Sequence, residues 1–152
     1  MPYWPFDSLW ASGIAHRAQR SRARRGAGGP AATLAAFPAA QLRETAPPGP
    51  KETWLGEAFV HGEDIRRPLG IPRAYPLAEV ARVMGSMPSN AIIGGKTRVA
   101  GLTLRASDTD FSVGSGRLVE GPAISLLLAA SGRKSALEDL SGPGVQVLAE
   151  GP

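Results

Sequence analysis

The chain has 152 residues, enough for one ordinary domain or two small ones, and its 43% hydrophobic and 20% charged residues exclude wholesale disorder. It contains no cysteine, which excludes disulfides, thiolate metal ligands and a cysteine nucleophile, so any thiol chemistry needs a thiol from a cofactor. No apolar run approaches the roughly 20 residues of a membrane-spanning helix, and the first residues lack a secretory pattern, so we expect a cytoplasmic protein without a membrane partner.

The first zone, residues 1–29, is irregular and rich in arginine and glycine. Residues 1–50 carry six arginines against two carboxylates, whereas residues 51–152 carry eleven basic and eleven acidic residues. The net charge of +4 therefore comes from the arginines between Arg17 and Arg25. Such a run can contact phosphates, but no aromatic residue interleaves it and glycines follow at once. We expect a solvated, poorly ordered arm and no nucleic-acid partner.

The second zone, residues 30–95, has helical patterns. Pro30 stands where a helix could begin, and Pro38 should kink or split that helix. Residues 54–67 predict a further helix, which ends before a proline because the residue preceding proline avoids the helical region. From about Pro76, apolar residues recur at helical spacing and predict another helix. This zone is therefore predicted to consist of two or three helices.

The third zone, residues 96–152, changes period. Residues 102–106 alternate apolar and polar side chains, which is typical of a half-buried strand, and residues 111–113 predict a short second strand. A proline then opens an apolar helix over residues 123–130, which a glycine can cap. Residues 145–148 predict a closing strand. The whole pattern predicts an α+β protein with a small α/β C-terminal domain.

The helix at residues 54–67 carries the strongest candidate site. At about 100° per residue, Glu57, His61 and Asp64 share one stripe, with Val60 on one shoulder and Ile65 on the other. A polar stripe with apolar shoulders favours an interior cleft. A carboxylate and an imidazole one turn apart can bind one cation, and Asp64 could hold the imidazole ring. The alternative is an ordinary ion pair on a helix surface.

Three stretches resemble a known family. The first is LGEAFVHGEDIRRPLG at residues 55–70, the second is AGLTLRASDTDF at residues 100–111, and the third runs from EGPA at residue 120 to SGR at residue 133, followed by LSG. The first looks like the metal-binding helix of the mycothiol-dependent maleylpyruvate isomerase family, within the larger group of DinB-like helical-bundle proteins. The others are similar to its C-terminal portion. The resemblance covers about residues 30–152.

The resemblance implies a partial DinB-like helical bundle that holds a divalent metal ion, usually zinc, followed by a small α/β domain resembling sterol carrier proteins. It implies an isomerase or thiol transferase that uses mycothiol and acts on a small molecule, by thiolate addition to a cis double bond, rotation and elimination. Carried over by position, Glu57 and His61 are metal ligands, and Arg133 is the best match for an arginine that holds the substrate carboxylate.

One departure from the family pattern affects the expected activity. In the family, a further metal histidine lies on an earlier helix that has no counterpart here, and His16, the other histidine of this chain, is expected to be an ordinary polar residue. We therefore expect a shortened member with a two-ligand site, inactive or nearly so. The competing hypothesis is a non-enzymatic module that binds a small ligand or another protein.

Overall fold

The computed structural model describes residues 29–42, 49–89 and 95–151. The chain divides into two compact units, Met1–Ala46 and Pro47–Pro152. The boundary expected near residue 95 does not coincide with this division, because the helices from Lys51 onward belong to the same unit as the sheet of the third zone. The arginine-rich arm and His16 lie outside the described residues.

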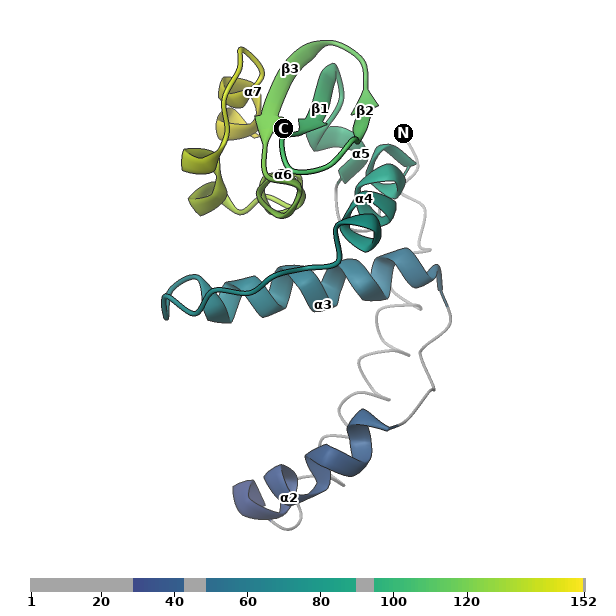
Figure 1. Ribbon diagram of the computed structural model, residues 1–152, viewed down its shortest axis with the longest axis vertical. Coiled ribbons are helices and arrows are strands. Elements are labelled where there is room, and N and C mark those ends of the chain that lie inside the picture. Colours follow the sequence, from purple (N-terminus) through teal and green to yellow (C-terminus); the bar gives the residue numbers. More distant parts are fainter. Residues whose placement is uncertain (1–28, 43–48, 90–94, 152) are drawn as a thin grey trace, which may run out of the picture. The chain divides into compact units, whose positions relative to one another are not determined.

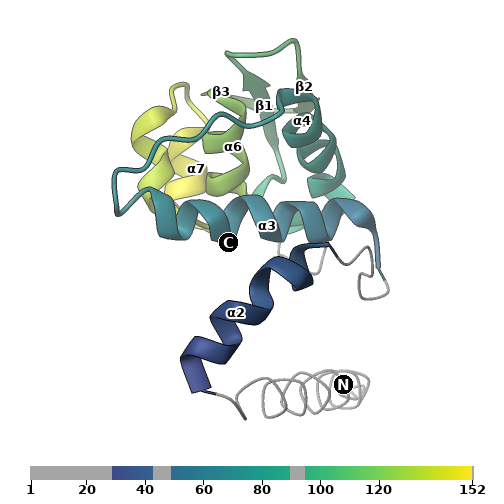
Figure 2. The ribbon, with the colours of Figure 1, turned by 60° about the horizontal axis from the view of Figure 1, so that its bottom comes forward.

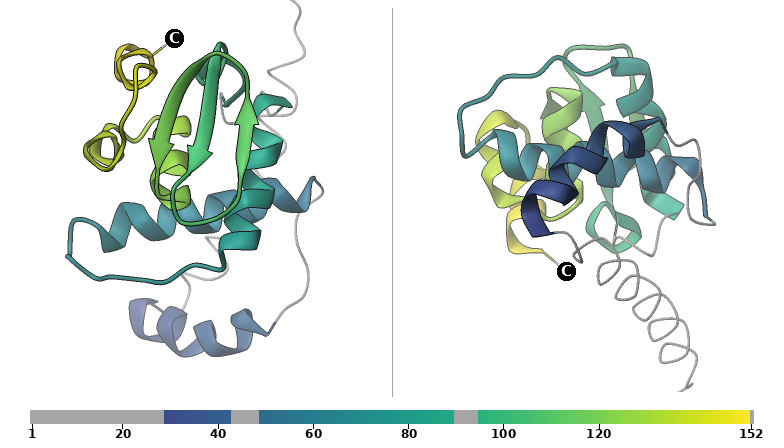
Figure 3. Two further views of the ribbon diagram at one scale, coloured as in Figure 1. Left: turned by 45° about the horizontal axis from the view of Figure 1, so that its top comes forward. Right: turned by 90° about the horizontal axis from the view of Figure 1, so that it is seen from below.

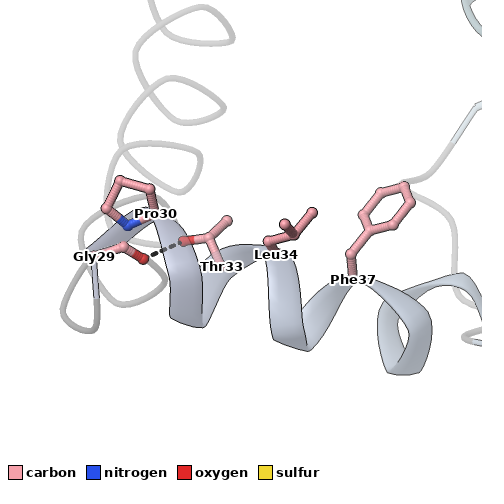
Figure 4. A pocket seen from close by; sticks show the side chains of 5 residues that line it. All are labelled: Gly29, Pro30, Thr33, Leu34 and Phe37. Carbon is pink, nitrogen blue, oxygen red and sulfur yellow. Dashed lines mark hydrogen bonds between the residues drawn. The ribbon is translucent and has the colours of Figure 1, made fainter.

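The first unit contributes one described helix, α2 (Gly29–Gln41) (Figure 1). This helix continues through Pro38, so the expected split does not occur. None of its residues is buried, and the side chains of Leu34 and Phe37 are 74% and 58% exposed. Figure 4 shows these two side chains on the helix beside Thr33, whose hydroxyl donates to the carbonyl of Gly29 at 3.2 Å. The helix therefore adds nothing to the core.

The second unit begins with two helices, α3 (Lys51–Arg66) and α4 (Leu77–Ser86), which pack against each other. The helix predicted at residues 54–67 is confirmed as α3, and the one predicted from Pro76 is confirmed as α4. The buried face of α4 consists of Val80, Val83 and Met84, which recur at helical spacing. A short 3-10 turn, η1 (Met87–Ser89), ends this segment.

The sheet has three strands in the order β2-β1-β3, and Figure 3 shows the central position of β1 (Leu102–Ala106). A short helix, α5 (Gly95–Arg98), precedes it. Strand β2 (Ser112–Gly114) pairs with β1 antiparallel, and β3 (Arg117–Gly121) pairs with it in parallel. The predicted alternation in β1 is confirmed, because its first, third and fifth side chains are buried. Strand β3 was not predicted.

Two glycines allow the chain to pass from β2 to β3 across the start of β1. Gly114 and Gly116 have φ values of 86° and 131°, which residues with side chains rarely adopt. A Cβ atom on Gly114 would lie 2.3 Å from the carbonyl oxygen of Leu102, and one on Gly116 would lie 2.0 Å from that of Gly101. Because the backbone approaches this closely, a very short connection between β2 and β3 is enough to bring β3 alongside β1 as its parallel partner.

Three helical segments complete the second unit: α6 (Ala123–Ala130), η2 (Lys134–Asp139) and α7 (Val145–Glu150). Helix α6 has the predicted bounds. The strand predicted at residues 145–148 is wrong, since these residues form α7. The alternation of Val145 and Val147 resembled a strand, but the backbone makes helical hydrogen bonds and Leu148 is the buried residue. Tertiary packing has overridden the local pattern.

Helix α6 is the centre of the core. It contacts β1 and β3 on one side and α3 and α4 on the other (Figure 2). Leu126, Leu127 and Leu128 are at most 1% exposed. The α+β class predicted from the sequence is therefore confirmed, with a small mixed sheet and helices packed on it. None of the helices in the described ranges combines the length and apolar character needed to cross a membrane.

Candidate functional site

The predicted stripe on α3 is formed by side chains in mutual contact. Nε2 of His61 lies 3.1 Å from Oε2 of Glu57, one turn earlier on the helix. Nδ1 of the same ring lies 3.0 Å from Oδ2 of Asp64, almost one turn later. The imidazole therefore lies between two carboxylates, with one ring nitrogen facing each of them.

The stripe lies on the surface of the second unit, so the expectation that it faces an interior cleft is wrong. The side chain of His61 is 61% exposed, and those of Glu57 and Asp64 are 44% and 36% exposed. One shoulder, Val60, is buried, but the other, Ile65, is 65% exposed. The buried face of α3, which includes Phe59 and Glu63, lies next to the stripe on the helix surface.

Arg133 reaches the stripe from the end of α6. Its Nε lies 3.1 Å from Oδ1 of Asp64 and its Nη2 lies 2.8 Å from Oδ2, so the guanidinium holds the carboxylate with two hydrogen bonds. Its Nη1 donates to the carbonyl of Ser131 at 3.0 Å. The structure thus brings the three candidate site residues, Glu57, His61 and Arg133, into one chain of contacts through Asp64.

The backbone at the end of α6 fixes the place from which Arg133 starts. Gly132 has a φ of 88°, its N–H donates to the carbonyl of Ala129, and the N–H of Arg133 donates to the carbonyl of Leu128. This pair of bonds is the Schellman motif, which ends helices at a glycine. The predicted glycine cap is therefore confirmed, and it directs the next side chain toward α3.

The charges in this chain of contacts reinforce one another. The hydrogen bonds from Arg133 lower the pKa of the Asp64 carboxyl below its ordinary value, with a smaller contribution from His61. The same hydrogen bonds raise the pKa of Arg133. Asp64 is therefore a firmly ionised acceptor, which is what a carboxylate needs to hold a neighbouring imidazole.

The donor atoms of Glu57 and His61 fit two positions around a divalent metal ion. Two ligand atoms at roughly 2.0–2.1 Å from a tetrahedral zinc ion are about 3.3 Å apart, close to the 3.1 Å between Oε2 of Glu57 and Nε2 of His61. Asp64, on the other ring nitrogen, has the place of a carboxylate that orients a metal-bound histidine. Within the described ranges, however, there is no group of three or more histidine, cysteine, aspartate or glutamate residues that could hold a metal ion.

A second polar network, which the sequence reasoning missed, joins α3 to the end of η2. Nη2 of Arg67 donates to Oδ2 of Asp139 at 2.7 Å and to the hydroxyl of Ser125 at 2.9 Å, and Nε donates to Glu63 at 3.3 Å. Tyr75 donates to the other oxygen of Glu63. Ser125 is only 1% exposed. These residues come from distant parts of the chain, and no local spacing in the sequence pointed to the network.

The two networks share a pocket of about 470 Å³ between the end of α3 and the segment from α6 to η2. Asp64, Arg67, Arg133 and Glu138 line it together with Leu128. Glu63 lines the pocket too, so two guanidinium groups and three carboxylates face it, and each guanidinium is paired with a carboxylate. A different pocket, of about 520 Å³ beside α2, is lined by Gly29, Pro30, Thr33, Leu34 and Phe37 (Figure 4). That second pocket has no titratable group in its described lining.

Comparison of the chain with protein-family models, with curated proteins and with solved structures found no match.

Proposed function

We propose that this chain is a member of the mycothiol-dependent maleylpyruvate isomerase family, and that Glu57 and His61 bind a divalent metal ion, expected to be zinc. The observation that carries the proposal is the arrangement of His61 between Glu57 and Asp64, at 3.1 and 3.0 Å. A surface ion pair needs only one carboxylate beside the imidazole. A second carboxylate that fixes the opposite ring nitrogen is the arrangement found around metal-bound histidines.

The residues of this chain have separate roles in the proposed site. Glu57 and His61 supply one oxygen and one nitrogen ligand, and Asp64 keeps the proton on Nδ1 so that the lone pair of Nε2 faces the metal. Bound there, the metal would lower the pKa of the mycothiol thiol and so provide a thiolate nucleophile. The same proposal includes the partial DinB-like bundle of residues 30–95 and the C-terminal domain of residues 96–152 that resembles sterol carrier proteins.

Arg133 is proposed to hold a carboxylate of the small-molecule substrate. An arginine has five N–H groups, and three of those of Arg133 are used in hydrogen bonds to Asp64 and Ser131. Within the described residues, two N–H groups thus remain for an anion in the adjoining pocket. The resemblance to the family and the position of Arg133 beside the pocket support the same role.

The test is a calorimetric zinc titration of the 152-residue chain, run beside an assay with maleylpyruvate and mycothiol. Because the described residues supply two ligands where catalytic zinc sites usually have three, we expect weak zinc binding and little turnover. His61→Ala should abolish zinc binding, and Glu57→Gln should weaken it. Glu52→Gln, on the same helix but paired with Arg82 at 3.7 Å, is the matched control and should leave zinc binding unchanged.

Three results would change this conclusion. Zinc binding that survives His61→Ala would reject the proposed metal site. Submicromolar binding that disappears in His16→Ala would identify His16 as the third ligand. Anion binding in the pocket, without zinc binding or turnover, would favour the alternative of a non-enzymatic small-ligand module.

A further inference from the structure

The carboxylate of Asp64 is shared between two residues that belong to different elements. Its Oδ2 lies 3.0 Å from Nδ1 of His61, on the same helix, and 2.8 Å from Nη2 of Arg133, which lies 69 residues further along the chain. Its Oδ1 lies 3.1 Å from Nε of Arg133. Both oxygens are therefore held by the guanidinium, and one of them also faces the imidazole.

We propose that Arg133 is a positioning residue for the metal site, and that it acts on His61 through Asp64. This inference rests on the proposed function, because it needs metal binding at Glu57 and His61. The side chain of Asp64 is 36% exposed, so without a partner it could turn toward water. The two hydrogen bonds from Arg133 fix the plane of the carboxylate, and the fixed carboxylate orients the ring.

The direction in which removal of Arg133 changes metal affinity distinguishes a positioning role from a purely electrostatic one. A guanidinium near a bound divalent cation repels it, so removal of the positive charge alone should tighten metal binding. If Arg133 instead orients His61 through Asp64, its removal should weaken metal binding, even though Arg133 need not touch the metal. Loss of such an outer partner typically lowers metal affinity about 10–100-fold. If Arg133 had only a structural role, its removal would lower the melting temperature, and its effect on metal affinity would not depend on the presence of Asp64.

The experiment measures zinc affinity by titration with zinc chloride in the 152-residue chain and in four variants. Arg133→Gln, Asp64→Asn and the double variant form a cycle that tests whether Arg133 acts through Asp64. Arg105→Gln is the matched control, since Arg105 is also an arginine paired with a carboxylate, that of Glu120 on the neighbouring strand. Thermal unfolding of every variant checks that the fold is retained.

We expect Arg133→Gln to weaken zinc binding about 10-fold, and Arg105→Gln to leave it unchanged. In the Asp64→Asn background, the same Arg133→Gln change should cause less than about a 2-fold further loss. A parallel titration of chain labelled with ¹⁵N-histidine should show the zinc-induced shift on Nε2 of His61. In the Arg133→Gln variant, the Nδ1 resonance should change as the ring loses its orientation.

Four outcomes would overturn the inference. If wild-type chain binds zinc at His61 but Arg133→Gln binds it equally or more tightly, the positioning role is wrong and the proposed function stands. If Arg133→Gln lowers zinc affinity about 10-fold in the Asp64→Asn background as well, Arg133 does not act through Asp64. Zinc bound to Nδ1 of His61 would likewise reject the route through Asp64. A wild-type chain that binds no zinc would overturn the proposed function, and the positioning role with it.

Discussion

At the scale of single residues, Asp64 joins the parts of the candidate site, because it contacts His61 on its own helix and Arg133 at the end of α6. Helical spacing is enough to align Glu57, His61 and Asp64, because backbone geometry fixes the angle between them. The contact from Arg133 depends on tertiary packing over 69 residues of sequence. The burial of the stripe was mispredicted for the same reason, since the polar pattern does not show which elements will cover a helix.

Asp139 should give the protein an acid-sensitive component of stability. Burial opposes ionisation of its carboxyl, but hydrogen bonds from Ser125 and Arg67 outweigh this effect and lower its pKa below the ordinary value. A carboxyl whose pKa is lower in the folded state stabilises the fold above its unfolded pKa of about 4. This contribution is then lost as the pH falls through the lower folded pKa.

The corresponding measurement is the free energy of unfolding by urea between about pH 7 and pH 3. We expect Asp139→Asn to be less stable than wild type at neutral pH, with the difference shrinking as the pH falls below about 4. Asp110→Asn, at an exposed position, is the control for the substitution itself and should give a small difference at neutral pH. A constant difference for Asp139→Asn would contradict the prediction.

At the scale of elements, patterns that agreed with the tertiary fold were predicted correctly. The alternation in β1 and the apolar run of α6 both follow from a face that is buried, and the flanking proline and glycine fixed the bounds of α6. Strand β3 was missed because, of its five residues, only Val119 and Gly121 are buried. Residues 145–148 were mispredicted because alternation over four residues is compatible with either a strand or one helical turn.

The connection from β2 to β3 should be intolerant of any side chain at Gly116. We expect Gly116→Ala to destabilise the chain by at least about 2 kcal/mol, because it combines an unfavourable φ with a clash against backbone. Gly70→Ala is the matched control, since Gly70 also has a positive φ, of 63°, but open space around it. Its cost should be about 1 kcal/mol. Equal losses for the two variants in chemical unfolding would show that the close approach is unimportant.

At the scale of the whole molecule, the hydrophobic core of the described residues belongs entirely to one unit. Every buried hydrophobic side chain lies between Phe59 and Leu148, whereas α2 has no buried residue. The three zones predicted from the sequence did not show this, because helical and strand periods report local structure and not which elements share a core. Grouping of α3 and α4 with the sheet follows from side-chain packing against α6.

A fragment of residues 47–152 should therefore fold on its own. We expect it to unfold cooperatively, with a melting temperature within about 5 °C of the full chain, because it keeps all of the described core. Circular dichroism during heating measures both properties. The control is the same fragment with Leu126→Ala, which removes a fully buried side chain and should cost about 2–5 kcal/mol. Loss of cooperativity in the unmodified fragment would show that Met1–Ala46 contributes to the core.

The central position of α6 also constrains the order in which the chain can fold as it is synthesised. Helices α3 and α4 emerge first and can pair, but the apolar residues that later contact α6 stay exposed until α6 has left the ribosome. At about 5–20 residues per second, this interval lasts seconds. Arg133 comes three residues after the end of α6, so the last contact of the candidate site forms only after α6 has been synthesised. A nascent chain that stalls before residue 133 would carry the pair of Glu57 and His61 without the arginine that holds Asp64 in place.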